Sequence, residues 1–506
     1  MDPRNLSIGD FVRRQAKLHG NRRLATFEDG STLTYGEADA LSETFGAGLL
    51  AAGIPAGGRV GTMLDSCREH LVASFGCAKA GLEEVPLHSA LKGAGLTHIL
   101  RTANIRLVIV DPQFVDCLRE VEGQLEQMPV LVRLGSDFDK LLRAPATALP
   151  QVSPFQVSSI LFTSGTTGLP KGVVRSHRAD LLSGWRAREA MDYRPDDVLF
   201  NVFPLAHINA KCNTLFGAML VGASVVLYGR FSASRFWETT RRHGITSASF
   251  QGAMLEILWK TRSEADRDNP VCTGRAAPVP AHLHKDFEAF FGIRLHETYG
   301  ATETGVLTVN RDRRPGSIGE CITDHFELAV LDENDDPVPD GQPGLLSVRP
   351  RLASVMFGGY LGMPEYTLGV SRNLWHHMGD VVVRDASGYF GFVRRNSSTI
   401  RRRGENITPW EVERAIGEVP GVLECAAYGV PSELGEEEVM VAVAAQADAV
   451  LDPAAIVRHC EAVLPRFAVP RYLRFVPAIP KNDSQKPVVT GLKAEAVTAD
   501  TWERPA

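Results

Sequence analysis

The stretch that decides the fold is residues 158–177, which read SSILFTSGTTGLPKGVVRSH. Its apolar run, 160–162, is typical of a buried strand, and the run ends in a loop of glycines and hydroxyl residues. Glycine permits positive φ, so such a loop can turn several backbone N–H groups toward one anion. Lys171 follows the loop with a compact positive charge that suits a polyphosphate. The stretch therefore predicts a phosphate-binding loop.

The order of residues excludes the common P-loop, because Gly168 is followed by Leu-Pro-Lys171-Gly rather than by Lys-Ser or Lys-Thr. A surface turn rich in glycine and threonine is the plain alternative. The segment TSGTTGLPKGV resembles the phosphate loop of the adenylate-forming superfamily, which contains acyl-CoA ligases, luciferases and the adenylation domains of peptide synthetases. The resemblance implies that ATP phosphates contact Thr163, Ser164, Gly165, Thr166, Thr167, Gly168 and Lys171.

The bulk properties describe an ordinary globular protein. A chain of 506 residues predicts two or more domains. The net charge of −6 argues against nucleic acid as a partner. Eight scattered cysteines without metal-site spacing indicate free thiols in a reducing compartment. We find no signal peptide and no apolar run long enough for a membrane span, so we expect a cytoplasmic protein.

Alternating helix-like and strand-like segments over residues 1–155 predict an α/β fold with parallel sheets. Residues 316–350 are rich in strands and turns and indicate a small β-subdomain, and the last hundred residues form an α+β unit. The resemblance implies a large N-terminal domain, 1–395, of two layered α/β lobes plus the β-subdomain. It implies a small mobile C-terminal domain, 396–506, with Ser397 as the hinge, where relatives usually carry Asp or Lys.

A second motif, HETYGATETG at residues 296–305, is the second strong signal for the resemblance. A polar loop after a strand would not require this order of residues. The family assigns Tyr299 to adenine stacking, Thr302 to the α-phosphate and Glu303 to Mg²⁺. Each type suits its task, since an aromatic face packs on a purine and a hard carboxylate binds a hard cation. The resemblance also assigns catalytic roles to Thr302 and Glu303.

Three further segments complete the expected ATP site. Residues 273–278 resemble the turn whose backbone contacts adenine, which assigns Arg275, Ala276 and Ala277 to the nucleotide. The family form of this turn is richer in glycine. Asp380 ends a W-x-x-x-G-D segment and is expected to accept hydrogen bonds from both ribose hydroxyls. Arg395 aligns with an arginine that contacts ribose and phosphate.

The acid pocket is expected around PLAHINA, residues 204–210. A lone histidine after an apolar strand is more often a core residue, but the resemblance gives His207 a catalytic role at the acid pocket, with Asn209 beside it. The same comparison places Phe250, Gly252, Gly300, Ala301 and Val306 in the acid-binding wall. No carboxylate lies between residues 201 and 215, so an ammonium would lack a partner there. We therefore expect an acid without an α-amino group.

Two C-terminal segments carry the remaining expectations. IRRRGENITPWEVE, residues 400–413, contains Arg403 and Gly404, which the resemblance places beside coenzyme A. A solvated run of charge is an equal alternative for the three arginines. Lys486, in a segment similar to the family's P-K-T-x-x-G-K, is expected to neutralise charge during adenylation. Lys481, four residues earlier by the motif count, is the weaker candidate.

The resemblance implies an AMP-forming acyl-CoA ligase that uses ATP, Mg²⁺ and coenzyme A on a small carboxylic acid, and its segments are closest in kind to crotonobetaine/carnitine–CoA ligases. The main alternative is a stand-alone adenylating enzyme that loads an acyl carrier protein or hands the adenylate on. A luciferase-like oxidising relative is disfavoured because nothing in the sequence supports oxygenation. A non-catalytic nucleotide sensor is disfavoured because Glu303, Asp380 and Lys486 are all retained.

Overall fold

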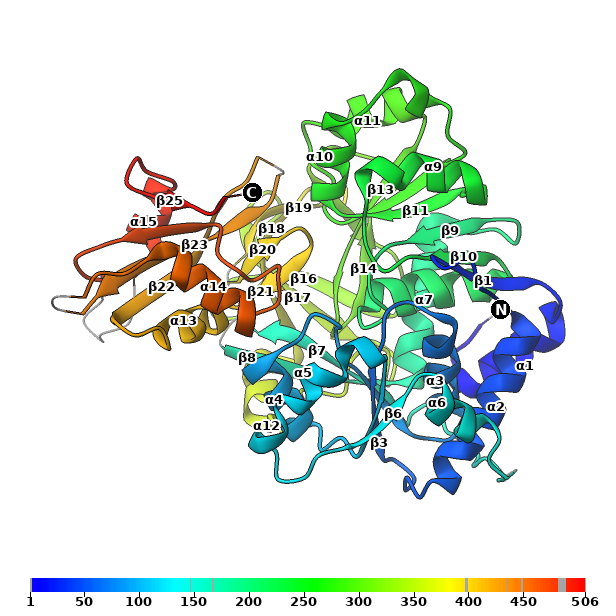
Figure 1. The fold of residues 1–506 in the computed structure, drawn as a ribbon. Coiled ribbons are helices and arrows are strands. Elements are labelled where there is room, and N and C mark those ends of the chain that lie inside the picture. The colour runs from blue at the N-terminus through cyan, green and yellow to red at the C-terminus, as the bar shows by residue number, and fades with distance from the viewer. Residues whose placement is uncertain are drawn as a thin grey trace.

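The computed structural model describes residues 2–145, 147–165, 168–395, 399–433, 435–446, 449–480 and 488–505. For Ser164, Gly165, Gly168 and Arg395 it describes the backbone alone. A large body is formed by the blue, cyan, green and yellow parts of the chain, and a smaller orange and red unit lies beside it (Figure 1).

A six-stranded sheet carries the phosphate-loop strand. The strands are, in order across the sheet, β6 (Val130–Arg133), β5 (Leu107–Val110), β3 (Arg59–Met63), β4 (Glu83–Pro86), β7 (Val157–Gly165) and β8 (Gly168–Ser176). All neighbours are parallel except β7 and β8. Parallel strands are buried on both faces, and β5 accordingly reads Leu-Val-Ile-Val. The phosphate loop is therefore the tip of an antiparallel hairpin at the sheet edge.

A thirteen-stranded sheet forms the rest of the large body. The strands are, in order, β16 (Phe326–Leu331), β17 (Pro343–Pro350), β18 (His376–Arg384), β19 (Phe390–Arg395), β15 (Ser317–Cys321), β14 (Gly305–Val309), β13 (Arg294–Ala301), β12 (Thr273–Ala276), β11 (Ser247–Phe250), β9 (Val198–Asn201), β10 (Ser224–Leu227), β1 (Arg23–Phe27) and β2 (Thr32–Thr34). β9 to β13 pair in parallel, and β14 to β19 pair antiparallel as the expected β-subdomain.

Helices cover both sheets and fill the space between them. They are α1 (Ile8–His19), α2 (Tyr35–Ala51), α3 (Arg68–Lys79), α4 (Gly93–Thr102), α5 (Val115–Arg119), α6 (Ser136–Leu142), α7 (His177–Met191), η3 (Asn209–Phe216), α8 (Gly217–Val221), α9 (Ala233–His243), α10 (Gly252–Lys260), α11 (His284–Phe291) and α12 (Pro364–Val370), with short turns η1 (Pro112–Phe114), η2 (Glu122–Gln124), η4 (Glu264–Arg267) and η5 (Arg372–Leu374). One core cluster joins α1, α2, α3, α7 and α8 to β1 and β10. These helices hold the two sheets together.

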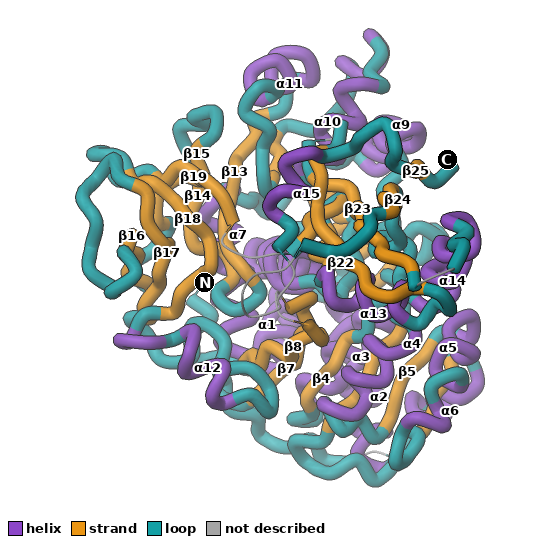
Figure 2. Tube along the Cα trace, turned by 90° about the vertical axis from the view of Figure 1, so that its left-hand side faces the viewer, coloured by secondary structure: helices purple, strands orange, loops and turns teal. Residues whose placement is uncertain are grey.

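The smaller unit is built on a four-stranded sheet. Its elements are the hairpin β20 (Ile400–Arg402) and β21 (Glu405–Ile407), the strands β22 (Val422–Pro431), β23 (Glu437–Ala445), β24 (Tyr472–Phe475) and β25 (Trp502–Glu503), and the helices α13 (Pro409–Gly417), α14 (Pro453–Val463) and α15 (Thr490–Glu495). Figure 2 shows α15 and α13 around this sheet. Side chains alternate along the strands, so the sheet has two apolar faces. One face packs on α13 and α14, and the other on α15.

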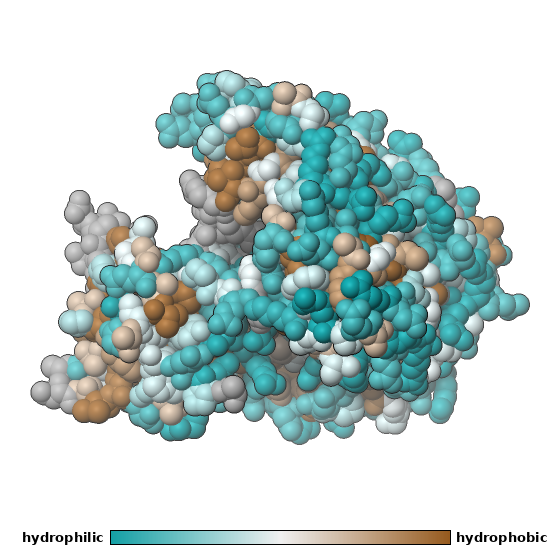
Figure 3. Space-filling model, turned by 90° about the horizontal axis from the view of Figure 1, so that it is seen from above, coloured by the Kyte–Doolittle hydropathy of each residue, from teal (hydrophilic) through white to brown (hydrophobic). Residues whose placement is uncertain are grey.

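The predicted fold class is confirmed: the chain is α/β, with a large N-terminal domain and a small C-terminal one. Viewed from above, hydrophobic residues at the surface lie in small separate patches (Figure 3). None of the helices in the described part of the chain is long and apolar enough to cross a membrane.

Candidate functional site

A cavity of about 410 Å³ lies where the β7–β8 hairpin, the thirteen-stranded sheet (the long sheet) and the β20–β21 hairpin meet. Segments far apart in the sequence therefore share one site. Eleven residues that the sequence assigned to ATP or to the acid line it: Thr163, Lys171, Asn209, Arg275, Ala277, Tyr299, Gly300, Ala301, Thr302, Glu303 and Val306. These residues come from six elements and the loops that follow them, so the fold is needed to assemble them.

At the phosphate end of the cavity, the hairpin register sets Lys171 opposite Thr163. The Lys171 ammonium donates to the Tyr366 hydroxyl at 2.8 Å and lies 4.0 Å from the centre of that ring. The lysine side chain is nearly buried. A buried ammonium held by an aromatic ring and a hydroxyl keeps its full charge available for an anion in the cavity.

Two tyrosine hydroxyls hold the carboxylates that the sequence selected. Tyr360 donates to Glu303 at 2.7 Å, and Tyr299 donates to the buried Asp380 at 2.6 Å. Burial and the neighbouring Glu303 carboxylate raise the pKa of Tyr360, which keeps its proton on the hydroxyl. Asp380 itself does not line the cavity but is joined to it through Tyr299. The hydroxyls fix both carboxylates at the cavity's edge.

A buried ion pair links the two main motifs and was not anticipated from the sequence. Arg175 donates to Asp180 at 2.5 Å, and both side chains are 0% exposed. Asp180 also accepts from the hydroxyls of Ser158 and Ser159, which begin the phosphate-loop strand. Arg175 donates in addition to the Thr302 carbonyl. The pair thereby ties the phosphate hairpin to the YGATE loop.

A buried arginine also lines the cavity. Arg275, 4% exposed, donates to the side-chain oxygens of Asn209, Ser249 and Thr298. Asn209 begins η3, a π-helical segment, and its oxygen also accepts from Asn201 at 3.0 Å. Burial lowers the pKa of Arg275. Its guanidinium is thus placed beside Asn209, which the sequence assigned to the acid.

Three predicted contacts lie elsewhere. Phe250 and Ala276 do not line the cavity, because both side chains pack in a buried cluster of the parallel part of the long sheet. Gly252 begins α10 and faces Pro278 instead. The neighbouring Gln251 is the residue of this segment that lines the cavity. The predicted segment thus borders the cavity through Gln251 rather than through Phe250 or Gly252.

The β20–β21 hairpin brings the C-terminal domain against the cavity. Arg403 and Gly404 form its turn with positive φ at both residues, as a two-residue type I′ turn requires. Gly404 accepts a hydrogen bond from the Gln251 amide at 3.4 Å, and a Cβ at Gly404 would overlap that amide. Arg403 is exposed, with its guanidinium 3.8 Å from Glu438. Arg401 and Asn406 of the hairpin line the cavity.

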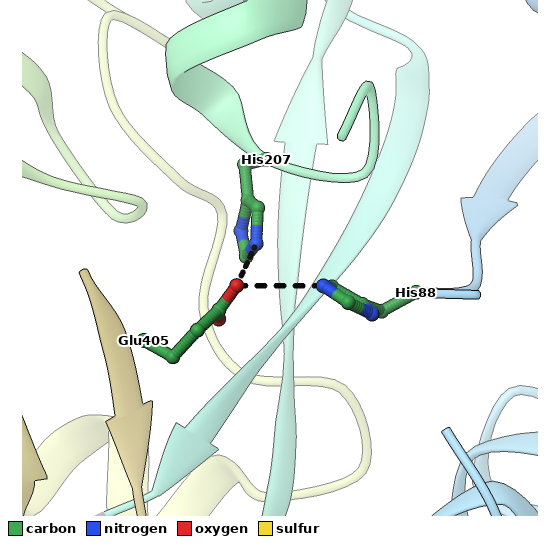
Figure 4. A group of neighbouring side chains, drawn as sticks. All are labelled: His88, His207 and Glu405. Carbon is green, nitrogen blue, oxygen red and sulfur yellow. Dashed lines mark ion pairs between the residues drawn. The ribbon is translucent and has the colours of Figure 1, made fainter. Parts of the chain in front are cut away.

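His207 lies at the contact between the domains rather than in the cavity wall. Its imidazole is 3.5 Å from the Glu405 carboxylate, and His88 lies 3.4 Å from the same oxygen (Figure 4). Within the described residues this is the one group of His, Cys, Asp or Glu ligand atoms close enough for a metal. The two ion pairs already give each group a partner. The Glu405 carboxylate of the C-terminal domain therefore bridges two histidines of the large body.

This ion pair predicts a pH-dependent contact between the domains. Burial lowers the pKa of His207, but Glu405 outweighs that and raises it above its ordinary 6.5. Because the docked form has the raised pKa, the pair stabilises docking fully below pH 6.5 and loses its effect as the pH rises through the raised value. Fluorescence energy transfer between labels on the two domains should report less docking at pH 8 than at pH 6.

Glu405→Gln removes the charge and should abolish this pH dependence, whereas Glu433→Gln, at another contact between the domains, should retain it. Glu433 contacts Lys260 through its backbone carbonyl, which the substitution leaves in place. An unchanged pH profile in Glu405→Gln would contradict the assignment.

Several predicted residues lie outside the described residues: Thr166, Thr167, Ser397 and Lys486. Their roles remain predictions. The structure adds cavity residues to which the sequence assigned no role in the site: Asn213, Thr298, Tyr360, Tyr366, His376, His377, Arg401 and Asn406. Asn213 could have been found from its spacing of four from Asn209 in one helical segment. The two tyrosines carry no such signal.

The cavity, with its phosphate hairpin, lysine and facing carboxylates, defines an acid-activating enzyme of the adenylate-forming class. A family model described as "AMP-binding enzyme" matches residues 12–361, more than half of the chain. A model described as "AMP-binding enzyme C-terminal domain" matches residues 411–486. The chain belongs to the AMP-binding enzyme family, and it is an AMP-forming acid–thiol ligase that uses ATP and coenzyme A.

Named relatives agree with this assignment. The chain is 33% identical to sulfoacetate–CoA ligase of Cupriavidus necator over 94% of each protein. It is 30% identical to crotonobetaine/carnitine–CoA ligase of Salmonella agona, covering 87% of this chain and 89% of the relative. The fold matches that of o-succinylbenzoate CoA synthetase from Bacillus subtilis with a TM-score of 0.86, at 21% identity and over 99% of both chains. The predicted superfamily and enzyme class are confirmed.

Proposed function

We propose that this cavity performs both half-reactions of an acyl-CoA ligase on a small carboxylic acid without an α-amino group. A carboxylate oxygen attacks the α-phosphorus of ATP and pyrophosphate leaves, which gives an acyl-AMP. The sulfur of coenzyme A then attacks the acyl carbon and AMP leaves. Lys171 and the phosphate hairpin hold the polyphosphate, and Thr302 donates to the α-phosphate.

The remaining roles are those that the family resemblance implies. Tyr299 packs on adenine, Asp380 accepts from the ribose and Arg395 contacts ribose and phosphate. The Glu303 carboxylate fits Mg²⁺, because it is a hard oxygen ligand at the cavity wall and Tyr360 fixes its orientation. When bound, Mg²⁺ neutralises phosphate charge. We propose a domain boundary at residue 395, with Ser397 as the pivot.

The observation that carries the two-step proposal is the arrangement of the C-terminal domain. The β20–β21 hairpin packs on the face of the four-stranded sheet that holds α13 and α14, through Ile400 and Ile407. Ile479 and Leu492, on either side of the segment that contains Lys486, pack on the opposite face. Since the hairpin faces the cavity, the domain must rotate to bring the Lys486 segment to the same place.

Lys486→Ala tests the first half-reaction. The variant should lose about 10²–10³-fold in acyl-AMP formation, the usual effect of removing one donor that acts in the transition state. Thioester formation from supplied acyl-AMP should change far less. In the proposal this step uses the domain arrangement with the β20–β21 hairpin at the cavity, in which Lys486 takes no part. Pyrophosphate release and thioester absorbance measure the two halves. Lys481→Ala serves as the control, and a larger loss in that variant would move the role to Lys481.

Three finer assignments complete the proposal. We propose that an acyl carrier protein does not replace coenzyme A as the thiol acceptor, and a panel of the two acceptors tests this. We propose a cytoplasmic location, supported by the eight cysteines, all of which are free thiols. The acid has no α-amino group in this proposal because the cavity end beside Asn209 presents the Arg275 cation and no carboxylate of η3.

A further inference from the structure

Arg275 is a buried cation whose contacts are all neutral. Its guanidinium donates to oxygens of Asn209, Ser249 and Thr298 and interacts with the Tyr193 hydroxyl. In the described part of the chain no carboxylate oxygen lies within the 4 Å of an ion pair, and its Nε has no hydrogen-bond partner. A buried charge without a counterion is costly unless a ligand supplies one.

Several other buried cations in the described part of the chain are paired with carboxylates. Arg175 is paired with Asp180, Lys211 with Glu84 and Lys79 with Asp39. Arg186 has no carboxylate, but it donates to two backbone carbonyls of the loop 304–306 and does not line the cavity. Arg275 does line the cavity, as does Lys171 at the phosphate hairpin. The cavity therefore has room for a bound anion that could serve as the counterion of Arg275.

The nucleotide does not account for this cation. Lys171 and Thr302 lie on the β7–β8 hairpin and the loop after β13, where the phosphates are proposed. Arg275 contacts Asn209 and Ser249, on η3 and β11. The reacting carboxylate does not account for it either, because that group loses its own charge when it forms the mixed anhydride of the acyl-AMP. Only a second anionic group would keep Arg275 paired through both half-reactions.

We infer that the acid substrate is a short carboxylic acid with a second anionic group, a sulfonate or a second carboxylate, which pairs with Arg275. This inference rests on the proposed function. Asn209, Ser249 and Thr298 hold the guanidinium in place without neutralising it. The acid is short because the cavity of about 410 Å³ also receives the adenylate. An acid with a quaternary ammonium or an ω-amino group would meet a like charge there.

The test compares matched acids in a pyrophosphate-release assay with saturating ATP. The pairs are malonate with propanoate and succinate with butanoate, sulfoacetate is the sulfonate arm, and glycine betaine is the cationic arm. The wild type should favour the doubly anionic member of a pair by at least about 30-fold in kcat/KM, since a buried charge pair commonly contributes that much. The sulfonate and carboxylate arms show which anion is preferred.

The variants test Arg275 directly. In Arg275→Met the preference should fall by about 30-fold, and Arg275→Lys should recover part of it. Asn209→Asp places a carboxylate against the guanidinium, so it should abolish the preference without lowering the melting temperature. Asn213 lines the same cavity and carries no charge. The preference of Asn213→Ala for doubly anionic acids should therefore stay within about threefold of that of the wild type.

Equal use of charged and uncharged acids by the wild type, or equal loss of preference in Arg275→Met and Asn213→Ala, would overturn the inference and leave the proposed function standing. Absence of pyrophosphate release with every acid would overturn both.

Discussion

Replacing Asp180 with Ala should lower the free energy of unfolding by about 3–5 kcal/mol, the usual cost of leaving one member of a buried ion pair alone. Arg175 would keep its charge with no counterion in a site that is closed to water. The hydroxyls of Ser158 and Ser159 would lose their acceptor as well. Denaturant titration measures the change, and acyl-AMP formation should fall because Arg175, which ties the phosphate hairpin to Thr302, loses the carboxylate that holds it in place.

Two controls make this prediction specific. Asp137→Ala removes a carboxylate from a surface pair with Lys140 and should have a much smaller effect. The double variant Arg175→Met/Asp180→Leu should be more stable than Asp180→Ala, because it leaves no unpaired charge. If Asp180→Ala were as stable as the wild type, water or another group would have to compensate the charge of Arg175, which would contradict the prediction.

The second large effect is expected in Gly404→Ala. Gly404 has φ +83° and faces the Gln251 amide, so an added Cβ both strains the backbone and overlaps that side chain. The hairpin would then dock imperfectly. Thioester formation from acyl-AMP should fall about 10²-fold, the scale of a displacement of 1 Å in a catalytic arrangement. Adenylation should change little, because in the proposal it uses the other face of the domain.

Gly388→Ala is the control that separates backbone strain from the overlap of an added Cβ with a neighbouring side chain. Gly388 has φ +88° and open space where a Cβ would lie, so the variant carries the backbone cost without the collision. It should retain thioester formation. Combining Gly404→Ala with Gln251→Ala should recover part of the loss. Equal losses in both half-reactions of Gly404→Ala would contradict the proposed separation of the two faces.

The sequence predicted the site where short motifs carry the chemistry. Lys171 of TSGTTGLPKG and Tyr299 and Glu303 of YGATE line one cavity. The α/β class followed from alternating apolar strands and helices. Phe250 shows the limit: neighbouring residues of a strand face opposite sides, and the wall residue is Gln251, one position later.

Long-range pairs could not be predicted in this way. Arg175 and Asp180 are neighbours in sequence, but their contact with Thr302 spans 127 residues and depends on how the two sheets meet. The Arg275 side chain illustrates a different limit. Its motif indicated a backbone contact with adenine, whereas the absence of a carboxylate partner among the described residues is visible only in three dimensions.

The most direct test of the acyl-AMP route uses an acid whose carboxylate is labelled with ¹⁸O. The enzyme, ATP, coenzyme A and the labelled acid are incubated, and the ¹⁸O content of each product is measured by mass spectrometry. The proposed route predicts that AMP and the CoA thioester each carry one ¹⁸O, because the attacking carboxylate oxygen stays on the α-phosphate when the thiol displaces AMP. Label in inorganic phosphate with formation of ADP, or unlabelled AMP beside the thioester, would contradict it.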